Sequence, residues 1–379
     1  MPGRRVTRGS ARHAGGVRGL RTLLAVALAA GLTLAAPACG AGDADRPGGL
    51  QQAEAADRAG DTVGDEPGAG DDTPQAEESA TSAASGGGEG TARADGADVA
   101  TTSPPSDSPV DPVLGVAGDG PSVPVITEAP RAGRSVVVLA AQIAEAEAVV
   151  RDPASTEARV ARQAHRQQVA YRELALHPEW LDPVLEALPA ALRTDALHHV
   201  AARQEFLDMA SEASLAPAPP AEWRVEAPAA AADLLRWYRG ADREYGVEWE
   251  VLAAINLVET GLGRIHADSV AGAQGPMQFM PATWARWGNG DVQDPHHAIY
   301  GAARYLAASG AAEGRLTDAL WAYNHDDRYV RAVNLYAGLL RRTPLLFRGL
   351  YHWQVYYRSA AGDLLLPEGY PTVPASARP

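Results

Sequence analysis

One glutamate in this sequence stands where acid chemistry is expected. Residues 251–258 read VLAAINLV and are apolar on nearly every side of a predicted helix, so this helix should lie in the centre of its domain. Glu259 follows directly, before a helix-breaking Gly261. Burial and the negative end of the helix dipole both disfavour a carboxylate, which predicts a raised pKa and a protonated acid able to protonate the leaving oxygen of a glycosidic bond. The alternative is a structural glutamate that caps the helix or pairs with Arg264 or Arg286.

A glycine-rich turn follows this helix. From Ser269 to Trp284 the sequence reads SVAGAQGPMQFMPATW. Gly272 and Gly275 permit a tight turn and a close approach of the backbone to a ligand. The amide of Gln278 can both donate and accept hydrogen bonds with a sugar acetamido group. The turn is therefore suited to close contact with a ligand. Trp284, like the tryptophans at 287 and 321 and the tyrosine at 329, fits either sugar stacking or a core position.

Four motifs in order carry a resemblance to a known family. They are VETG, SVAGAQGPMQFMPATW, GNGDVQDPHHAIYGAARYL and ALWAYNHDDRYVRAVNLYA. Over residues 228–345 the sequence resembles the catalytic domain of bacterial lytic transglycosylases with a lysozyme-like fold, and the GPMQFMP and YNH elements are most similar to the membrane-bound B type. The resemblance implies that Glu259 is the single catalytic acid/base. It further implies that Ser269, Gln278, Tyr323 and Asn324 bind the substrate.

The resemblance also implies a reaction on peptidoglycan strands. Glu259 would protonate the oxygen between N-acetylmuramic acid and N-acetylglucosamine and then take the proton of the 6-hydroxyl, giving a 1,6-anhydro sugar with no metal or organic cofactor. Hydrolases usually need two carboxylates, roughly 5–5.5 or 6.5–9.5 Å apart. A muramidase that uses water, with Asp268, Asp291 or Asp326 as second carboxylate, stays open as an alternative. So does a non-catalytic lipoprotein that only binds the cell wall.

The charge of the chain is concentrated in one segment. The 379 residues have a net charge of −14, and all 33 basic residues are arginine. Residues 41–128 carry 18 acidic residues against three arginines, whereas the remainder after residue 128 is nearly balanced. No basic stripe lies outside the N-terminus, which argues against a nucleic-acid-binding protein.

The N-terminus has the features of an export signal. Six arginines precede the apolar stretch from Leu23 to Ala36, and Ala36-Pro37-Ala38 stands directly before Cys39, the one cysteine of the chain. This predicts a signal peptide over residues 1–38. Cys39 resembles the acylation site of bacterial lipoproteins, although Ala36 stands where leucine is commonest. We expect an exported lipoprotein anchored in the membrane at its outer face, with a simply secreted protein as the alternative.

The rest of the chain is expected to be mainly α-helical. Residues 39–130 are acidic, rich in Gly, Ala, Pro and Ser and free of aromatic residues, which predicts a disordered tether. Helical spacing predicts a small all-helical module over residues 131–215, which is a spacer, a docking site for a cell-wall protein or a support for the domain behind it. The lysozyme-like domain is expected over residues 216–379 and to close with a β-hairpin, because Tyr351, Trp353, Val355 and Tyr357 alternate before a turn at residues 361–363. No metal site is predicted.

Overall fold

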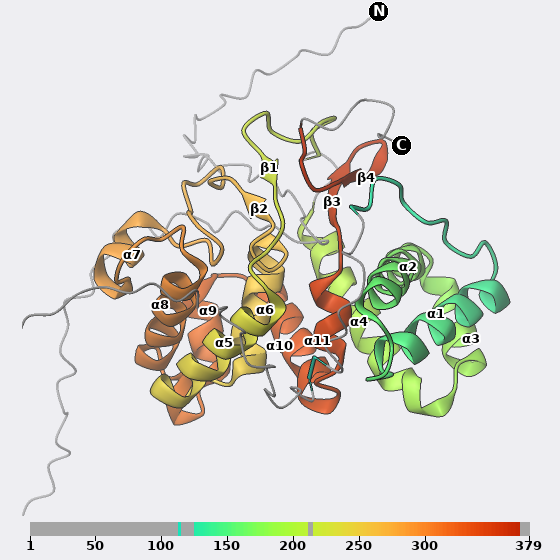
Figure 1. Ribbon diagram of the computed structural model, residues 1–379, viewed down its shortest axis with the longest axis horizontal. Coiled ribbons are helices and arrows are strands. Elements are labelled where there is room, and N and C mark those ends of the chain that lie inside the picture. Colours follow the sequence, from blue (N-terminus) through green and yellow to red (C-terminus); the bar gives the residue numbers. More distant parts are fainter. Residues whose placement is uncertain (1–112, 115–124, 211–214, 372–379) are drawn as a thin grey trace, which may run out of the picture. The chain divides into compact units, whose positions relative to one another are not determined.

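The computed structural model describes residues 113–114, 125–210 and 215–371, and these ranges lie in one compact unit. The predicted signal peptide (residues 1–38), the lipidation site Cys39 and nearly all of the predicted tether lie outside them. The described part is mainly helical, with two small two-stranded sheets (Figure 1), which confirms the predicted fold class and its C-terminal hairpin. Within this part of the chain, no helix is both long and apolar enough to cross a bilayer.

The described residues before 210 form four α-helices. The first begins after Ser135, whose side-chain oxygen accepts a hydrogen bond from the backbone N–H of Val138 at 3.4 Å, a common N-cap arrangement. These helices confirm the helical content that the apolar spacing predicted for this region. The bounds are α1 Val136–Val150, α2 Glu157–Leu176, α3 Leu181–Ala187 and α4 Ala190–Met209.

The described residues after 215 form seven α-helices, of which α6 is buried among the others. Helix α6 contacts α5, α8 and α10. Every residue from Val251 to Thr260 is buried, as the nearly uniform apolar sequence predicts. The bounds are α5 Ala231–Tyr245, α6 Trp249–Thr260, α7 Pro281–Trp287, α8 Pro295–Ala308, α9 Leu316–Tyr323, α10 Asp327–Arg342 and α11 Leu346–Tyr351.

Two antiparallel strand pairs share a small apolar cluster. Strand β1 (Arg224–Val225) pairs with β2 (Ile265–His266), and β3 (Val355–Ser359) pairs with β4 (Gly362–Leu366). The hairpin begins later than the alternating aromatic and apolar residues predicted, because Tyr351 is the last residue of α11 rather than part of the hairpin. The cluster joins both pairs through Trp223, Val225, Ile265, Val355, Tyr357 and Leu366.

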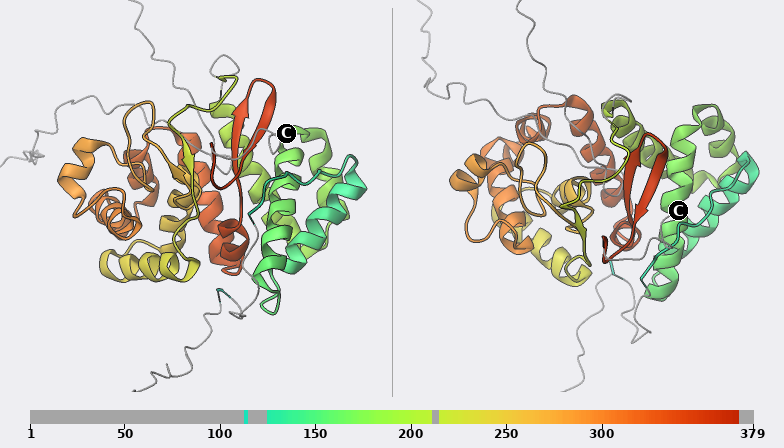
Figure 2. Two further views of the ribbon diagram at one scale, coloured as in Figure 1. Left: turned by 45° about the horizontal axis from the view of Figure 1, so that its top comes forward. Right: turned by 90° about the horizontal axis from the view of Figure 1, so that it is seen from above.

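The helices before and after residue 215 pack against each other directly. Figures 1 and 2 show α1 to α4 (green) beside α10 and α11, with α5 to α9 (yellow to orange) on the other side. Phe206 of α4 and Val333 of α10 belong to the same buried cluster as α6. Glu205 accepts two hydrogen bonds of 2.7 Å from Arg331 of α10. The division into domains at residues 215 and 216 remains a prediction, but the apolar core is continuous across it.

Candidate active site

Glu259 lies on the last turn of α6 and is almost completely buried. Its side chain is 3% exposed, and the hydroxyl of Tyr329 on α10 donates a hydrogen bond of 2.8 Å to Oε1. Burial raises the pKa of Glu259 to about 8, although the hydrogen bond from Tyr329 lowers it. Between the ordinary carboxyl pKa of 4.5 and about pH 8, Glu259 is therefore a protonated carboxylic acid, whereas most carboxyl groups are ionised.

The end of α6 is fixed by a sharp change of backbone direction. Gly261, Leu262 and Gly263 all have positive φ angles, of 65°, 65° and 86°. Such a conformation is costly for leucine, and the Leu262 N–H offsets part of that cost by donating to the carbonyl of Asn256 at 3.0 Å. The helix therefore ends at Thr260, one residue after Glu259.

Thr260 ties this helix end to the glycine-rich turn. Its hydroxyl donates to the carbonyl of Pro276 at 2.6 Å and accepts from the N–H of Gly263 at 3.0 Å. The backbone of Gln274 and Phe279 pairs in both directions at 2.8 Å and closes the turn between them. The glycine-rich turn is thus held at the end of α6.

Ser269 and Gln278 shape this turn. The hydroxyl of Ser269 accepts from the N–H of Ala273 at 2.9 Å. Gln278 has φ of 49°, a left-handed conformation that is rare outside glycine, and its amide Nε2 donates to the carbonyls of Gly275 at 3.0 Å and Ala267 at 3.3 Å. Both residues predicted to bind substrate lie in one turn, and both form part of its internal hydrogen bonding.

Tyr323 and Asn324 lie where α9 ends. The hydroxyl of Tyr323 donates to the carbonyl of Met277 at 2.6 Å, so α9 holds the same turn from another side. The ring of Tyr323 is parallel to that of Tyr329, with 6.5 Å between centroids. Asn324 is 2% exposed, and its Oδ1 has no hydrogen-bond partner among the described residues. An unsatisfied amide oxygen is costly in a protein interior, which marks Asn324 as a side chain with capacity for a ligand or a water molecule.

The acids considered as second carboxylates have other partners. Asp268 accepts from the side chain of Gln274 at 3.2 Å, Asp291 accepts from the N–H of Gln293 at 2.9 Å, and Asp326 caps α10. Within the described residues, no second carboxylate affects the pKa of Glu259, and Tyr329 is its hydrogen-bond partner. The alternative of a structural pair with Arg264 or Arg286 is therefore wrong for the part of the chain that the structure describes.

Tyr329 is the residue of this site that sequence reasoning did not identify. The pattern left it between sugar stacking and the core, but its ring is fully buried and its hydroxyl reaches Glu259. The available signal was its position in the motif ALWAYNHDDRYVRAVNLYA, which also contains Tyr323 and Asn324. Two of the tryptophans left between sugar stacking and the core differ in exposure. Trp321 is 46% exposed, whereas Trp284 is packed edge-on against Phe279.

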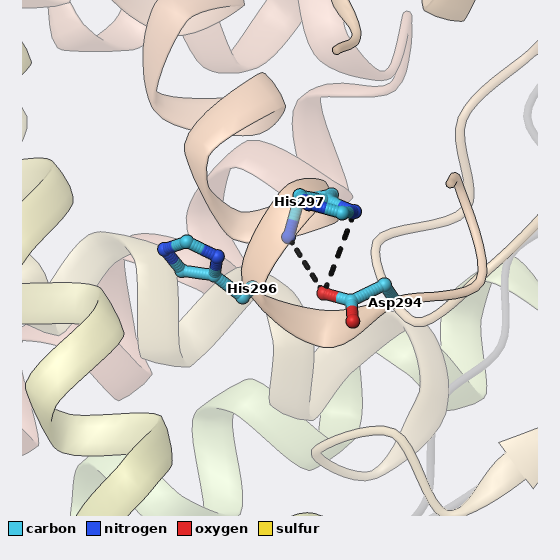
Figure 3. A group of neighbouring side chains, drawn as sticks. All are labelled: Asp294, His296 and His297. Carbon is cyan, nitrogen blue, oxygen red and sulfur yellow. Dashed lines mark hydrogen bonds and ion pairs between the residues drawn. The ribbon is translucent and has the colours of Figure 1, made fainter. Parts of the chain in front are cut away.

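Three side chains at the start of α8 lie close enough together to suggest a metal site. Potential ligand atoms of Asp294, His296 and His297 lie within 4.8 Å of one another (Figure 3). However, Asp294 caps α8 by accepting from the N–H of His297 at 3.0 Å, and Nδ1 of His297 faces the N–H of Asp291 at 3.2 Å. Figure 3 shows the His296 ring turned away from the other two, and it packs against Trp237 and Tyr300. The three side chains are therefore held together by capping and packing contacts at the N-terminus of α8.

Comparison with known proteins gives two matches to parts of the chain. Residues 237–340 match the family model described as the transglycosylase SLT domain. Membrane-bound lytic murein transglycosylase F of Thiobacillus denitrificans is 30% identical over 148 residues. That alignment covers 34% of this chain and 31% of the relative, so the chain spans about a third of the relative's length. No solved structure matches.

Proposed function

We propose that this protein is a peptidoglycan lytic transglycosylase. The observation that carries the proposal is Glu259, a buried acid with a pKa of about 8 that has no second carboxylate beside it among the described residues. The match of residues 237–340 to the transglycosylase SLT domain, and the similarity to a lytic murein transglycosylase, support this class of enzyme. The relative is of the F type, and the resemblance of this chain to the B type stays a prediction.

In the proposed reaction Glu259 serves first as acid and then as base. Its carboxyl proton passes to the glycosidic oxygen that joins N-acetylmuramic acid to N-acetylglucosamine, and the bond to the muramic C1 breaks. The resulting carboxylate then accepts the proton of the muramic 6-hydroxyl while that oxygen bonds to C1. The glutamate ends in the protonated form in which it began, and no water is consumed.

The surrounding residues have different tasks in this reaction. Tyr329 donates to Oε1 and stabilises the carboxylate that forms between the two steps. Tyr323 is a positioning residue, because its hydroxyl is used by the Met277 carbonyl. Asn324, with its unsatisfied Oδ1, and the amide of Gln278 are assigned to the acetamido and hydroxyl groups of the sugar, and Ser269 to the shape of the turn.

The cellular location is inferred from the N-terminal sequence rather than from the described residues. We infer export through residues 1–38 and anchoring through a lipid on Cys39, with a secreted protein as the alternative. The enzyme would then reach peptidoglycan from the outer face of the membrane. We likewise propose, from the sequence alone, that a cell-wall protein can dock on residues 131–215.

Mass spectrometry of soluble fragments released from purified peptidoglycan tests the reaction. The full chain should release muropeptides that are one water lighter than hydrolysed ones, and Glu259→Gln should release none while keeping its circular dichroism spectrum. Asp268→Asn, the same carboxyl-to-amide change on an exposed residue of the neighbouring loop, is the matched control and should retain release. Reducing-end muramic products would instead show a muramidase, and binding to peptidoglycan without release would show a wall-binding protein.

A further inference from the structure

Helix α6 contains three polar side chains in its buried part, and the acid is only one of them. Between Val251 and Thr260 these are Asn256, Glu259 and Thr260, with exposed fractions of 0%, 3% and 1%. Glu259 is bonded to Tyr329, which leaves the other two to be explained. A buried polar group is costly unless it is hydrogen-bonded, so the partners of Asn256 and Thr260 show what these two side chains hold in place.

The hydroxyl of Thr260 connects the end of α6 to the glycine-rich turn. It donates to the carbonyl of Pro276 at 2.6 Å and accepts from the N–H of Gly263 at 3.0 Å. The next carbonyl of the turn, that of Met277, accepts from the hydroxyl of Tyr323 on α9, also at 2.6 Å. Two consecutive carbonyls are therefore bonded to hydroxyl groups on two different helices, which fixes the turn relative to α6.

Asn256 and Tyr238 support the Thr260 hydroxyl from within the core. Oδ1 of Asn256 lies 3.4 Å from Oγ1 of Thr260, and Nδ2 of Asn256 donates to the hydroxyl of Tyr238 on α5 at 2.9 Å. Tyr238 is fully buried and packs edge-on against Phe347 of α11. These three side chains form a buried polar chain from α5 through α6 to the turn, and each member of such a chain restricts the others.

This polar chain lies between the acid and the residues assigned to the sugar. Thr260 directly follows Glu259, and the carbonyl that it holds is two residues before Gln278. The hydroxyl of Thr260 therefore sets the distance between the acid and the turn that carries Gln278. Catalysis is sensitive to such distances, since a misplacement of about 1 Å can cost roughly a hundredfold in rate.

We infer that Thr260 is a positioning residue, whose hydroxyl, supported by Asn256 and Tyr238, holds the sugar-binding turn in register with the acid. The inference rests on the proposed function. Thr260 acts on geometry and not on the ionisation of Glu259, because the pKa of that acid is set by burial and by the bond from Tyr329.

Muropeptide release by the full chain with Thr260→Val tests the role of the hydroxyl. Valine keeps the shape of threonine without the hydroxyl, so kcat/KM should fall about tenfold to a hundredfold at a temperature well below unfolding. Thr260→Ser keeps the hydroxyl and should restore most of the activity. The alkaline limb of the pH profile should stay at the wild-type pH in both variants. Tyr238→Phe should have a smaller effect, and none in the Thr260→Val background, because both act through the same contact.

Thr343→Val is the matched control for the change of side chain. Thr343 directly follows α10, and its hydroxyl accepts from Arg151 at 3.1 Å and lies 3.4 Å from Asp195. The variant thus loses partly buried hydrogen bonds outside the site. It should lower the urea midpoint and leave kcat/KM at the wild-type value.

Amide hydrogen exchange of residues 274–279 tests the contact without any need for activity. Exchange of this segment should be faster in Thr260→Val, whereas Thr343→Val should leave it at the wild-type rate, because local opening of the turn governs it. Unchanged exchange in Thr260→Val would refute the hold of Thr260 on the turn. Faster exchange combined with a wild type that releases no muropeptides would instead refute the proposed function.

Three kinetic results would also overturn the inference. Wild-type release by Thr260→Val would show that the hydroxyl is not needed. Failure of Thr260→Ser to restore release would assign the effect to packing of the methyl group. A shifted alkaline limb would show that Thr260 acts through the ionisation of Glu259 and not through the position of the turn.

Discussion

Replacing Glu259 by glutamine should make the protein more stable, relative to the wild type, as the pH rises. The carboxyl group is buried, and its pKa is raised to about 8 from an ordinary value of 4.5. The folded protein therefore keeps a proton on Glu259 between these two pH values, whereas the unfolded chain releases it. Because the folded state binds more protons, the free energy of unfolding of the wild type falls as the pH rises through this window. Glutamine has no proton to release and removes this dependence.

The size of the effect depends on the two pKa values. One pKa unit corresponds to about 1.36 kcal/mol, so the window from pH 5 to pH 8 contributes about 3.5 kcal/mol to the difference between wild type and variant. Above pH 8 both states of the wild type are ionised and the difference levels off. Domains unfold with about 5–15 kcal/mol in total, so this contribution is large enough to measure.

Urea unfolding at half-unit pH steps from 5 to 9 measures this stability difference between wild type and Glu259→Gln. The stability of Glu259→Gln relative to wild type should increase steadily up to about pH 8 and then stay constant, and Asp268→Asn provides the control for a carboxyl-to-amide change at an exposed position. Other titrating groups are present in both proteins and cancel in the difference. Parallel curves for wild type and Glu259→Gln would show that Glu259 ionises normally, and the acid role assigned to it would then have no physical basis.

Other substitutions test the surroundings of the acid. Tyr329→Phe removes a hydrogen bond that lowers the pKa of the acid, so the alkaline limb of the kcat/KM profile should move up by about one pH unit. Tyr323→Phe loses the bond to the Met277 carbonyl and should lower the free energy of unfolding by about 1 kcal/mol in urea titrations. Gln278→Gly relieves the left-handed backbone but removes the two hydrogen bonds that the side chain donates within the turn, so that free energy should fall by about 1 kcal/mol and muropeptide release should fall as well. His199→Leu should lose less stability between pH 6.5 and 4 than wild type. Burial lowers the pKa of His199, whose ring nitrogens have no hydrogen-bond partner among the described residues, to about 4, so its protonation opposes folding.

Local sequence signals predicted the parts of the site that depend on neighbouring residues. The apolar run before Glu259 predicted its burial, and the raised pKa results from that burial. Asp294 and Asp326 each precede a helix, and both side chains accept from a backbone N–H in its first turn, as aspartates at this position commonly do. Hydrogen bonds between residues that are at most three or four positions apart can be predicted from the sequence, because the backbone alone brings the partners together.

Contacts between distant residues were not predictable. Tyr329 is 70 residues from Glu259, and helical spacing says only that its ring faces the core. The left-handed backbone of Gln278 is equally hidden, because no glycine or asparagine stands there and the conformation is imposed by the pairing of Gln274 with Phe279. Both features belong to the packing of the turn against α6 and α9, which the order of motifs does not specify.

Helix α10 connects the acid to the helices before residue 210. One face of α10 presents Tyr329 to Glu259, and another packs against α4, where Phe206 is fully buried. Exposed ion pairs such as Glu205 with Arg331 contribute about 0–1 kcal/mol each, whereas truncating a buried phenylalanine costs roughly 3–5 kcal/mol, so the apolar contact holds α10 in place. Of the roles open for residues 131–215, the packing therefore favours support of the site, because loosening α4 would move the hydroxyl that stabilises the carboxylate.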